Sequence, residues 1–364
     1  MKIGIDARLI EETGVGRYIR NLTAELARID TQNEYVIFLR KKSFDAYVLP
    51  NTRWTKKLAE VPWHTMSEQI VIPKLLRDAR VDVVHIPYHN PPILYSGAMV
   101  ITIHDLTILH FNTGKATTLP PILYALKRFG YWVELAVGLR RAKSIIAVSE
   151  TTKRELMDHF GIAERKIHVT YEGVDEKIIA ESKKNTKSAS NGEYFLYVGN
   201  AYPHKNLDTF LDGFAKYSGS TKLVMVGKDD FFYHRLREKV KALQLDERVS
   251  FFGGANDDEL HNLYRNAKML IFPSRMEGFG LPALEAIALG TPVLCSDIPI
   301  FHEILGASAT YMDSTSIDAI ASALHNADET KTKSRIDAEV LLAKYNWKNM
   351  AEETKKIYEN SICI

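Results

Sequence analysis

The sequence predicts an α/β protein built from two doubly wound units in tandem, and three observations support this fold class. The chain has 364 residues, which is too long for one typical hydrophobic core and suits two domains of about 150 to 200 residues. Short continuous apolar runs alternate with amphipathic helical patterns, as in parallel sheets that are covered on both faces. One polar stretch without apolar periodicity, residues 181–193, interrupts the alternation. We therefore expect a first unit over 1–180, a linker over 181–193 and a second unit over 194–345.

The first half opens on an apolar strand, KIGIDA, which the glycine-bearing segment EETGVG joins to an amphipathic helix over residues 17–29. Further strands are expected in EYVIFL, VDVVHI, MVITIH, KSIIAVS and KIHVTY. Ser149 has the side chain and the position of a helix N-cap, and Gly161 is a typical residue for the end of the same helix.

The second half repeats the alternation after the expected linker. Strands are expected in YFLYVG, TKLVMVG, VSFFG, KMLIFPS and PVLCSD. Helices are expected in NLDTFLDGFAKY, YHRLREKVKAL, DDELHNLYRNA and LPALEAIALG, and the chain closes on an amphipathic helix, WKNMAEETKKIYENSI.

Composition excludes several classes of protein. The net charge of +2 indicates no nucleic-acid partner. The two cysteines, Cys295 and Cys363, do not make a disulfide framework, so a reducing cytoplasm is expected. Charged residues near the N-terminus argue against a signal peptide, and no run reaches the roughly 18 to 20 apolar residues of a spanning helix. Scattered histidines and two distant cysteines suggest no metal site, and we expect no cofactor.

Two acids stand in an apolar segment of the second half, MEGFGLPALEAIALGTPV. Glu277 lies in the loop that enters a helix, and Glu285 lies about one turn inside it. The preceding strand delivers this loop to the carboxyl end of the expected sheet, where open α/β sheets bind ligands. The paired oxygens of a carboxylate match a vicinal diol, so the segment suggests a sugar or ribose site. The simpler interpretation is a helix-start charge and an exposed helical residue.

With its neighbours this segment resembles the retaining GT-B glycosyltransferases of family 4. The matching runs are YVGNAYPHKNLDTFLDGF, KLVMVG and the block from VSFFGG to VLCSD, with GVGRY, TIHDL, IIAVSETTKREL and YEGVD in the first half. The resemblance covers essentially the whole chain and implies two Rossmann-like domains that face each other across a cleft. It places the nucleotide-sugar donor in the second domain and the acceptor in the first, and residues 346–364 as a helix that crosses back to the first domain.

The resemblance also implies roles for single residues. Glu285 would accept hydrogen bonds from the ribose, Glu277 would contact hydroxyls of the transferred sugar, and Lys205 would neutralise the donor diphosphate. Other donor-side positions are Gly16, Gly199, Asn200, Gly227, Gly278, Phe279, Gly280 and Leu281. His104 would face the transferred sugar as a catalytic residue with Glu277 and Lys205. Asp105 and His89 are candidates on the acceptor side.

Simpler interpretations stay open for several of these positions. Lys205 also fits a solvated loop lysine, and His104 a structural histidine at a strand end. Asn200 stands where the family often has arginine, and Arg17 or Arg275 could compensate for that missing cation. The segment around Gly16 is a flexible loop in our interpretation, but it is no dinucleotide fingerprint, because the third glycine is replaced by Ile19.

A basic segment with aromatic residues lies in the expected acceptor half, over residues 115–143. It contains six basic residues, one acid (Glu134), and Phe129, Tyr131 and Trp132. Such a segment is either a core helix with a solvated basic edge, which is the simpler interpretation, or a peripheral contact with the inner face of an anionic membrane.

The predicted activity is transfer of a hexose from a nucleoside diphosphate sugar to a glycan or polyprenyl-linked acceptor. The first half is similar to bacterial and archaeal mannosyltransferases of O-antigen and related glycan pathways, so we expect GDP-mannose as the donor, with UDP-glucose or another UDP-hexose as the alternative. Two alternative hypotheses remain: a nucleotide-sugar epimerase on the same fold, and a noncatalytic sugar-nucleotide-binding protein.

Overall fold

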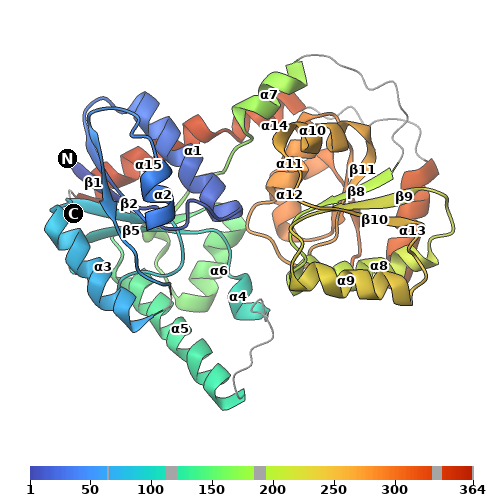
Figure 1. Cartoon of the computed structure of the whole chain (residues 1–364), viewed down its shortest axis with the longest axis horizontal. Coiled ribbons are helices and arrows are strands. Elements are labelled where there is room, and N and C mark those ends of the chain that lie inside the picture. Colours follow the sequence, from blue (N-terminus) through green and yellow to red (C-terminus); the bar gives the residue numbers. More distant parts are fainter. Residues whose placement is uncertain (64, 112–120, 184–193, 330–337, 363–364) are drawn as a thin grey trace. The chain divides into compact units, whose positions relative to one another are not determined.

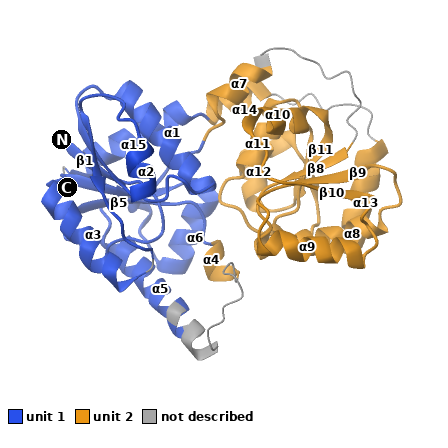
Figure 2. Ribbon diagram, viewed as in Figure 1, with its two compact units in different colours: residues 1–106, 116–172, 346–364 blue, residues 107–115, 173–345 orange. Residues whose placement is uncertain are grey.

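The computed structural model describes residues 1–63, 65–111, 121–183, 194–329 and 338–362 (Figure 1). Most of the expected linker, the beginning of the basic segment and Cys363 lie outside these residues. The chain forms two compact units, and Figure 2 shows them in different colours. Unit 1 comprises residues 1–106, 116–172 and 346–364, and unit 2 comprises residues 107–115 and 173–345.

Unit 1 is built around a parallel sheet in the order β3-β2-β1-β4-β5-β6-β7. Its strands are β1 (Lys2–Asp6), β2 (Glu34–Leu39), β3 (Trp54–Leu58), β4 (Val83–Ile86), β5 (Ala98–Ile103), β6 (Ser144–Ala147) and β7 (Ile167–Val169). Its helices are α1 (Gly14–Ile29), α2 (Lys41–Ala46), α3 (Met66–Ala79), α5 (Pro121–Arg141), α6 (Glu150–Phe160) and α15 (Trp347–Ile362).

Unit 2 is built around a second parallel sheet, in the order β10-β9-β8-β11-β12-β13. Its strands are β8 (Tyr194–Val198), β9 (Lys222–Val226), β10 (Val249–Phe252), β11 (Ala267–Phe272), β12 (Val293–Ser296) and β13 (Thr310–Met312). Its helices are α4 (Thr107–His110), α7 (Glu176–Lys183), α8 (Leu207–Lys216), α9 (Phe231–Ala242), α10 (Asp257–Asn266), α11 (Leu281–Ala288), α12 (Pro299–Leu305), α13 (Ile317–Glu329) and α14 (Ala338–Lys344).

These two sheets confirm the predicted α/β fold class with two Rossmann-like units. Nearly every residue of the inner strands is buried, as parallel strands with helices on both faces require. The local signals at α6 are also confirmed, because Ser149 Oγ accepts a hydrogen bond from Thr152 N at 3.0 Å and Gly161 adopts φ +61°. The strands β3 and β13 were not predicted. They are short and half-exposed, so no apolar run marks them.

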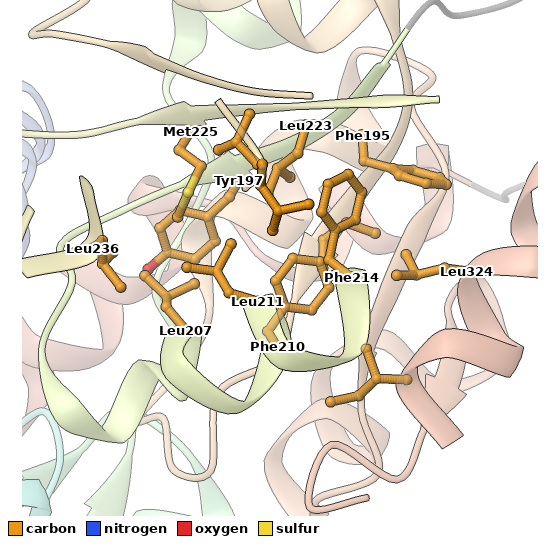
Figure 3. Close-up of a cluster of buried hydrophobic side chains, with 14 of the residues drawn as sticks. Phe195, Tyr197, Leu207, Phe210, Leu211, Phe214, Leu223, Met225, Leu236 and Leu324 are labelled. Carbon is orange, nitrogen blue, oxygen red and sulfur yellow. The ribbon is translucent and has the colours of Figure 1, made fainter. Parts of the chain in front are cut away.

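The core of unit 2 illustrates how the sheet is covered. Side chains from β8 and β9 pack against α8, α9 and α13, and Figure 3 shows part of this cluster. Phe195, Phe210, Phe214, Leu211 and Leu324 are fully buried in it. Burial of each such side chain contributes about 1.5 to 3 kcal/mol, and the packed face fixes the strand ends from which the loops of unit 2 emerge.

The last helix, α15, belongs to unit 1 and is held there by buried polar contacts. Tyr358 hydroxyl lies 2.6 Å from His85 Nδ1, and Thr102 Oγ1 lies 2.7 Å from His85 Nε2. Ser361 Oγ donates to Ser144 Oγ at 3.0 Å. Burial lowers the pKa of His85 to about 3, so its imidazole is neutral at physiological pH.

A pH-dependent loss of stability follows from the lowered pKa of His85. The unfolded chain protonates this histidine below about pH 6.5, whereas the folded chain does so only near pH 3. As the pH is lowered from about 6.5 to about 3, the free energy of unfolding of unit 1 should therefore fall, by up to about 1.4 kcal/mol per pH unit from this group. His85→Asn should flatten that slope.

Urea denaturation followed by tryptophan fluorescence measures this effect in unit 1 alone, because Trp54, Trp63, Trp132 and Trp347 all belong to that unit. His234→Asn, at an exposed position of unit 2, is the control and should leave the slope unchanged. Equal slopes in the wild type and in His85→Asn would contradict the prediction.

Candidate functional site

The candidate site of unit 2 lies at the carboxyl ends of its two central strands. The strand order reverses between β8 and β11, since β9 follows β8 on one side and β12 follows β11 on the other. In doubly wound sheets, the loops on the two sides of such a switch point diverge and leave room for a ligand. Here these are the loop that follows β8 and the loop that follows β11, and both carry residues that the sequence singled out.

Lys205 and Glu277 meet at this switch point. Lys205 Nζ donates to Glu277 Oε1 at 2.5 Å, and Ser274 Oγ donates to the same oxygen at 2.7 Å. The lysine and glutamate side chains are 12% and 11% exposed, so each is largely shielded from water yet reachable. Lys205 Nζ also lies 5.7 Å from the centroid of the Phe272 ring, which favours a cation at that point. The site thus holds one cation and one carboxylate in fixed positions.

The backbone after Glu277 turns sharply into α11. Gly280 adopts φ +100°, a conformation that side-chain-bearing residues rarely take, and a Cβ there would lie 3.2 Å from the ring of Phe301. Phe279 is buried and packs edge-to-face on Tyr345, with centroids 5.6 Å apart. Pro282 stands in the first turn of the helix, as predicted. Gly278, Phe279, Gly280 and Leu281 therefore lie together at the start of α11, beside Glu277.

Glu285 is buried inside α11 and is not the exposed residue of the simpler interpretation. It is 2% exposed, and its Oε2 accepts a hydrogen bond of 2.9 Å from the hydroxyl of Tyr264 on α10. Burying a carboxylate is costly unless donors reach it. Tyr264, itself fully buried, is such a donor, and no pattern in the sequence indicates that the two residues pair.

The loop after β8 is tied down through its own backbone. Gly199 adopts φ +150°, and its carbonyl accepts from the hydroxyl of Tyr233 at 2.8 Å. A Cβ on Gly227 would lie 2.3 Å from the same carbonyl, so glycine is required where β9 ends. Asn200 Oδ1 accepts from Tyr202 N at 3.3 Å. The side chain of Asn200 thus helps to shape the loop, and it brings no cation.

Of the two arginines that could replace the missing cation, Arg275 belongs to unit 2 and Arg17 to unit 1. Arg275 follows Ser274, its backbone N–H donates to His204 O at 2.8 Å, and its guanidinium donates to Thr209 Oγ1 at 3.2 Å. Arg275 therefore spans the same two loops as the pair of Lys205 and Glu277.

In unit 1, His104 follows β5 and contacts two acceptors. Its Nδ1 lies 2.9 Å from Glu172 Oε1, and its Nε2 lies 3.2 Å from Pro87 O. Both partners are acceptors, and a neutral imidazole donates from one nitrogen only, so the tautomer decides which of the two contacts is a hydrogen bond from the ring. Tyr18 packs edge-to-face on the imidazole, with centroids 4.9 Å apart. Glu172 was not among the predicted site residues, although it stands in the run YEGVD.

The other candidates of unit 1 lie near this end of the sheet. His89 is buried, with its ring 3.6 Å from that of Tyr88. Asp105 follows His104 directly. Burial raises the pKa of Glu155 to about 7, and the negative charge of Asp105 is the next largest cause of this shift. Gly16 lies in the first turn of α1, and a Cβ there would lie 2.5 Å from Ile10 O. The prediction of a flexible loop at Gly16 is therefore wrong, because close backbone packing holds this segment as helix.

A buried ionic cluster at the carboxyl end of β1 was also missed. Arg8 bridges Asp6 at 2.7 Å and Glu68 at 2.6 Å, and Asn90 Nδ2 donates to the same Glu68 oxygen at 2.6 Å. Burial alone would lower the pKa of Arg8, but the two carboxylates raise it, so the guanidinium is charged. The cluster joins β1, α3 and the loop after β4, and thereby fixes the edge of the sheet that carries His89.

The basic segment is described from residue 121 onward, where it forms α5. Leu135 and Leu139 are buried, whereas Phe129 is 63% and Trp132 is 41% exposed. The helix therefore has a core-facing part and an exposed aromatic part, and both earlier interpretations remain predictions. In the described part of the chain, no helix has the length and apolar character to cross a membrane. Within the same residues, no group of three or more His, Cys, Asp or Glu side chains is placed to hold a metal ion.

Comparisons with known proteins bear on the whole chain. The family model for Glycosyltransferase Family 4 matches residues 13–177, and the model for Glycosyl transferases group 1 matches residues 178–337. The O-antigen chain mannosyltransferase RfbU from Salmonella typhimurium is 29% identical over 93% of this chain and 94% of that protein. The O-antigen chain mannosyltransferase B from Escherichia coli is 25% identical over 95% of this chain and 96% of that protein.

Solved structures share the fold. HepE from Anabaena, crystallised with UDP and glucose, superposes with a TM-score of 0.73 at 16% identity, over 99% of this chain and all of that one. A likeness at this level of identity concerns the fold, and it agrees with the GT-B arrangement of two Rossmann-like domains that the sequence suggested.

The contact between Tyr264 and Glu285 predicts a stability effect. Tyr264→Phe removes the donor to a buried carboxylate and should lower the free energy of unfolding of unit 2 by about 1.5 to 3 kcal/mol. Tyr194→Phe is a matched control, because its half-buried hydroxyl donates to a neutral acceptor, Leu263 O, at 2.9 Å, and its loss should cost about 1 kcal/mol. Calorimetric unfolding of both variants tests this, and an effect of Tyr264→Phe no larger than that of Tyr194→Phe would refute it.

Proposed function

The chain belongs to glycosyltransferase family 4, and from this premise we propose that it transfers mannose from GDP-mannose to a hydroxyl of a glycan or lipid-linked acceptor, with retention at the anomeric carbon. The donor sugar is proposed from the relatives, since two proteins that are similar over nearly their whole length are named O-antigen chain mannosyltransferases.

The observation that carries the chemistry is the pair of Lys205 and Glu277 at the switch point of unit 2. A nucleoside diphosphate sugar has an anionic diphosphate next to a ring of hydroxyls. The ammonium suits the diphosphate, whose negative charge grows as the leaving group departs. The carboxylate suits the hydroxyls, and Glu285, one turn into α11, suits the ribose. The diphosphate would then take over from Glu277 as the partner of Lys205.

In the proposed reaction, the bond between the anomeric carbon and the diphosphate oxygen breaks, and its electron pair leaves with the diphosphate. The acceptor oxygen bonds to the anomeric carbon on the same face, and its proton passes to a phosphate oxygen. We favour this front-face route over a covalent glycosyl-enzyme intermediate, because the proposal assigns Glu277 to hydroxyls of the transferred sugar and Glu285 to the ribose, which leaves neither carboxylate to attack the anomeric carbon. No metal is needed in this proposal, since Lys205 and backbone N–H groups offset the charge of the leaving group.

The acceptor is proposed as a glycan or a polyprenyl-linked sugar. For a lipid-linked acceptor, the exposed aromatic part of α5, with Leu126, Phe129 and Trp132, would contact the membrane surface beside the basic residues of that helix. Binding to vesicles with and without anionic lipid measures this contact.

A panel of nucleotide sugars tests the donor. GDP-mannose, UDP-glucose, UDP-galactose and GDP alone are each added to the full chain in EDTA, and the shift in melting temperature and the release of nucleoside diphosphate are measured. GDP-mannose should give the largest shift, and nucleotide release should rise when acceptor is added. A larger response to a UDP-hexose would identify that sugar nucleotide as the donor in place of GDP-mannose. Conversion of a nucleotide sugar to its epimer without acceptor would indicate an epimerase. Binding without turnover would indicate a noncatalytic protein.

Glu277→Ala tests the proposed site directly. The substitution should reduce kcat for transfer by about 100-fold or more, because it removes a group that contacts the reacting sugar, while circular dichroism shows a folded protein. Glu247→Ala, at an exposed position of the same unit, should retain wild-type kcat. Transfer at the wild-type rate by purified Glu277→Ala would remove Glu277 from the mechanism.

A further inference from the structure

A polar cavity opens in unit 2 beside the loops that carry Lys205 and Glu277. It has a volume of about 350 Å³, within the range of ligand sites in proteins. It lies at the carboxyl ends of β12 and β13, and its lining comes from the segments after three strands: Arg275, Asp297, Ile298, Asp313, Ser314 and Thr315.

Two contacts connect this cavity to the candidate donor site. Asn206, which follows Lys205, donates from Nδ2 to Ser314 O at 2.7 Å. Arg275 stands two residues before Glu277, and its backbone N–H donates to His204 O at 2.8 Å. The loop that carries Glu277 therefore also lines the cavity through Arg275, and the loop that carries Lys205 is hydrogen-bonded to two lining residues, Arg275 and Ser314.

Both acids of the cavity are oriented through one carboxylate oxygen. Asp313 Oδ1 accepts from Thr315 N at 2.9 Å and from Thr315 Oγ1 at 2.6 Å. Asp297 Oδ1 lies 2.6 Å from His302 Nε2, and the imidazole of His302 stacks on Tyr311 at 4.0 Å. Both sets of contacts involve Oδ1, so each carboxylate is oriented through that oxygen and can still accept hydrogen bonds from a ligand. The hydrogen bonds from Thr315 also keep the pKa of Asp313 below its usual range, so Asp313 is ionised at neutral pH.

The charges of the lining decide which class of ligand fits. Two carboxylates face one guanidinium, so the cavity carries a net negative charge and disfavours a phosphate or another anion. Ile298 is the one apolar side chain of the lining, so the cavity offers little apolar contact to an acyl chain. Several acceptors, one multidentate donor and a threonine hydroxyl suit a ligand that offers many hydroxyl groups.

We propose that this cavity is a carbohydrate subsite that binds a sugar residue of the acceptor glycan through Asp297, Asp313 and Arg275. The inference rests on the proposed function and deepens it, since it makes the acceptor an oligosaccharide that the donor-binding unit itself recognises. Carboxylates that accept from paired sugar hydroxyls, opposite an arginine that donates to ring and hydroxyl oxygens, supply that recognition.

The test uses Asp297→Asn and Asp313→Asn in the full chain. Asparagine keeps the Oδ1 acceptor for His302 or Thr315, so the local structure is preserved and only the charge at the cavity is lost. Asp318→Asn is the matched control, because Asp318 is an exposed aspartate of the same unit whose pair with Lys216 lies on the surface. Calorimetry measures binding of free manno-, gluco- and galacto-oligosaccharides of three residues, and of GDP and UDP as probes of the donor site.

We expect at least one oligosaccharide to bind the wild type, and each cavity variant to weaken its binding about fivefold or more. Nucleotide binding should stay within about twofold of the wild type, and Asp318→Asn should change neither. The proposal is overturned if none of the oligosaccharides binds, if the cavity variants bind them as the wild type does, or if nucleotide binding weakens in parallel, which would make the cavity part of the donor site.

Arg275→Ala adds a separate outcome. Loss of GDP and UDP binding with unchanged oligosaccharide binding would assign Arg275 to the diphosphate and overturn its place in the subsite. The two proposals fail separately. Oligosaccharide binding that depends on Asp313, without turnover of any nucleotide sugar, would support the subsite and overturn the proposed reaction. Turnover of a nucleotide sugar, with oligosaccharide binding that does not depend on Asp313, would support the reaction and overturn the subsite.

Discussion

The ion pair between Lys205 and Glu277 is the interaction on which the candidate site depends, and it exists because parallel strands end at one edge of a sheet. The two residues lie 72 positions apart in the sequence. The strands β8 and β11 are nevertheless neighbours in the sheet, and both loops therefore start at the switch point. A cation and a carboxylate that neutralise each other at 2.5 Å can remain shielded from water without a ligand. A diphosphate sugar offers each of them a new partner of the right charge or polarity.

Buried polar groups in both units follow one physical rule, that a polar group removed from water needs a partner. Glu285 has Tyr264, and Arg8 has Asp6 and Glu68. These contacts add less to net stability than the apolar cores do, since part of their energy offsets desolvation. Their main effect is orientation, because each one ties a strand end or a loop at the carboxyl edge of a sheet to a neighbouring helix.

The two polar features of unit 2 have different charge, which suggests how one unit can hold two ligands in order. The pair of Lys205 and Glu277 is neutral overall and contains an ammonium that an anion can bind in place of Glu277, whereas the cavity lined by Asp297 and Asp313 is net negative. A nucleotide sugar and a neutral glycan would therefore be sorted by electrostatics before any detailed fit. Because Arg275 and Asn206 connect the two features, movement of one loop would change the geometry of both the ion pair and the cavity.

The sequence by itself determined the fold class, because apolar runs and caps are local signals, and it supplied the candidate residues of the donor site through the resemblance of the segment around Glu277 and Glu285, and of its neighbours, to family 4. It could not supply the partners of those residues. Tyr264 beside Glu285, Glu172 beside His104, and the cluster around Arg8 join positions far apart in the chain, and Gly16 is helical because its backbone packs on Ile10. Such contacts are decided only when the strands take their order in the sheet, since spacing along the chain carries no record of which strand ends become neighbours.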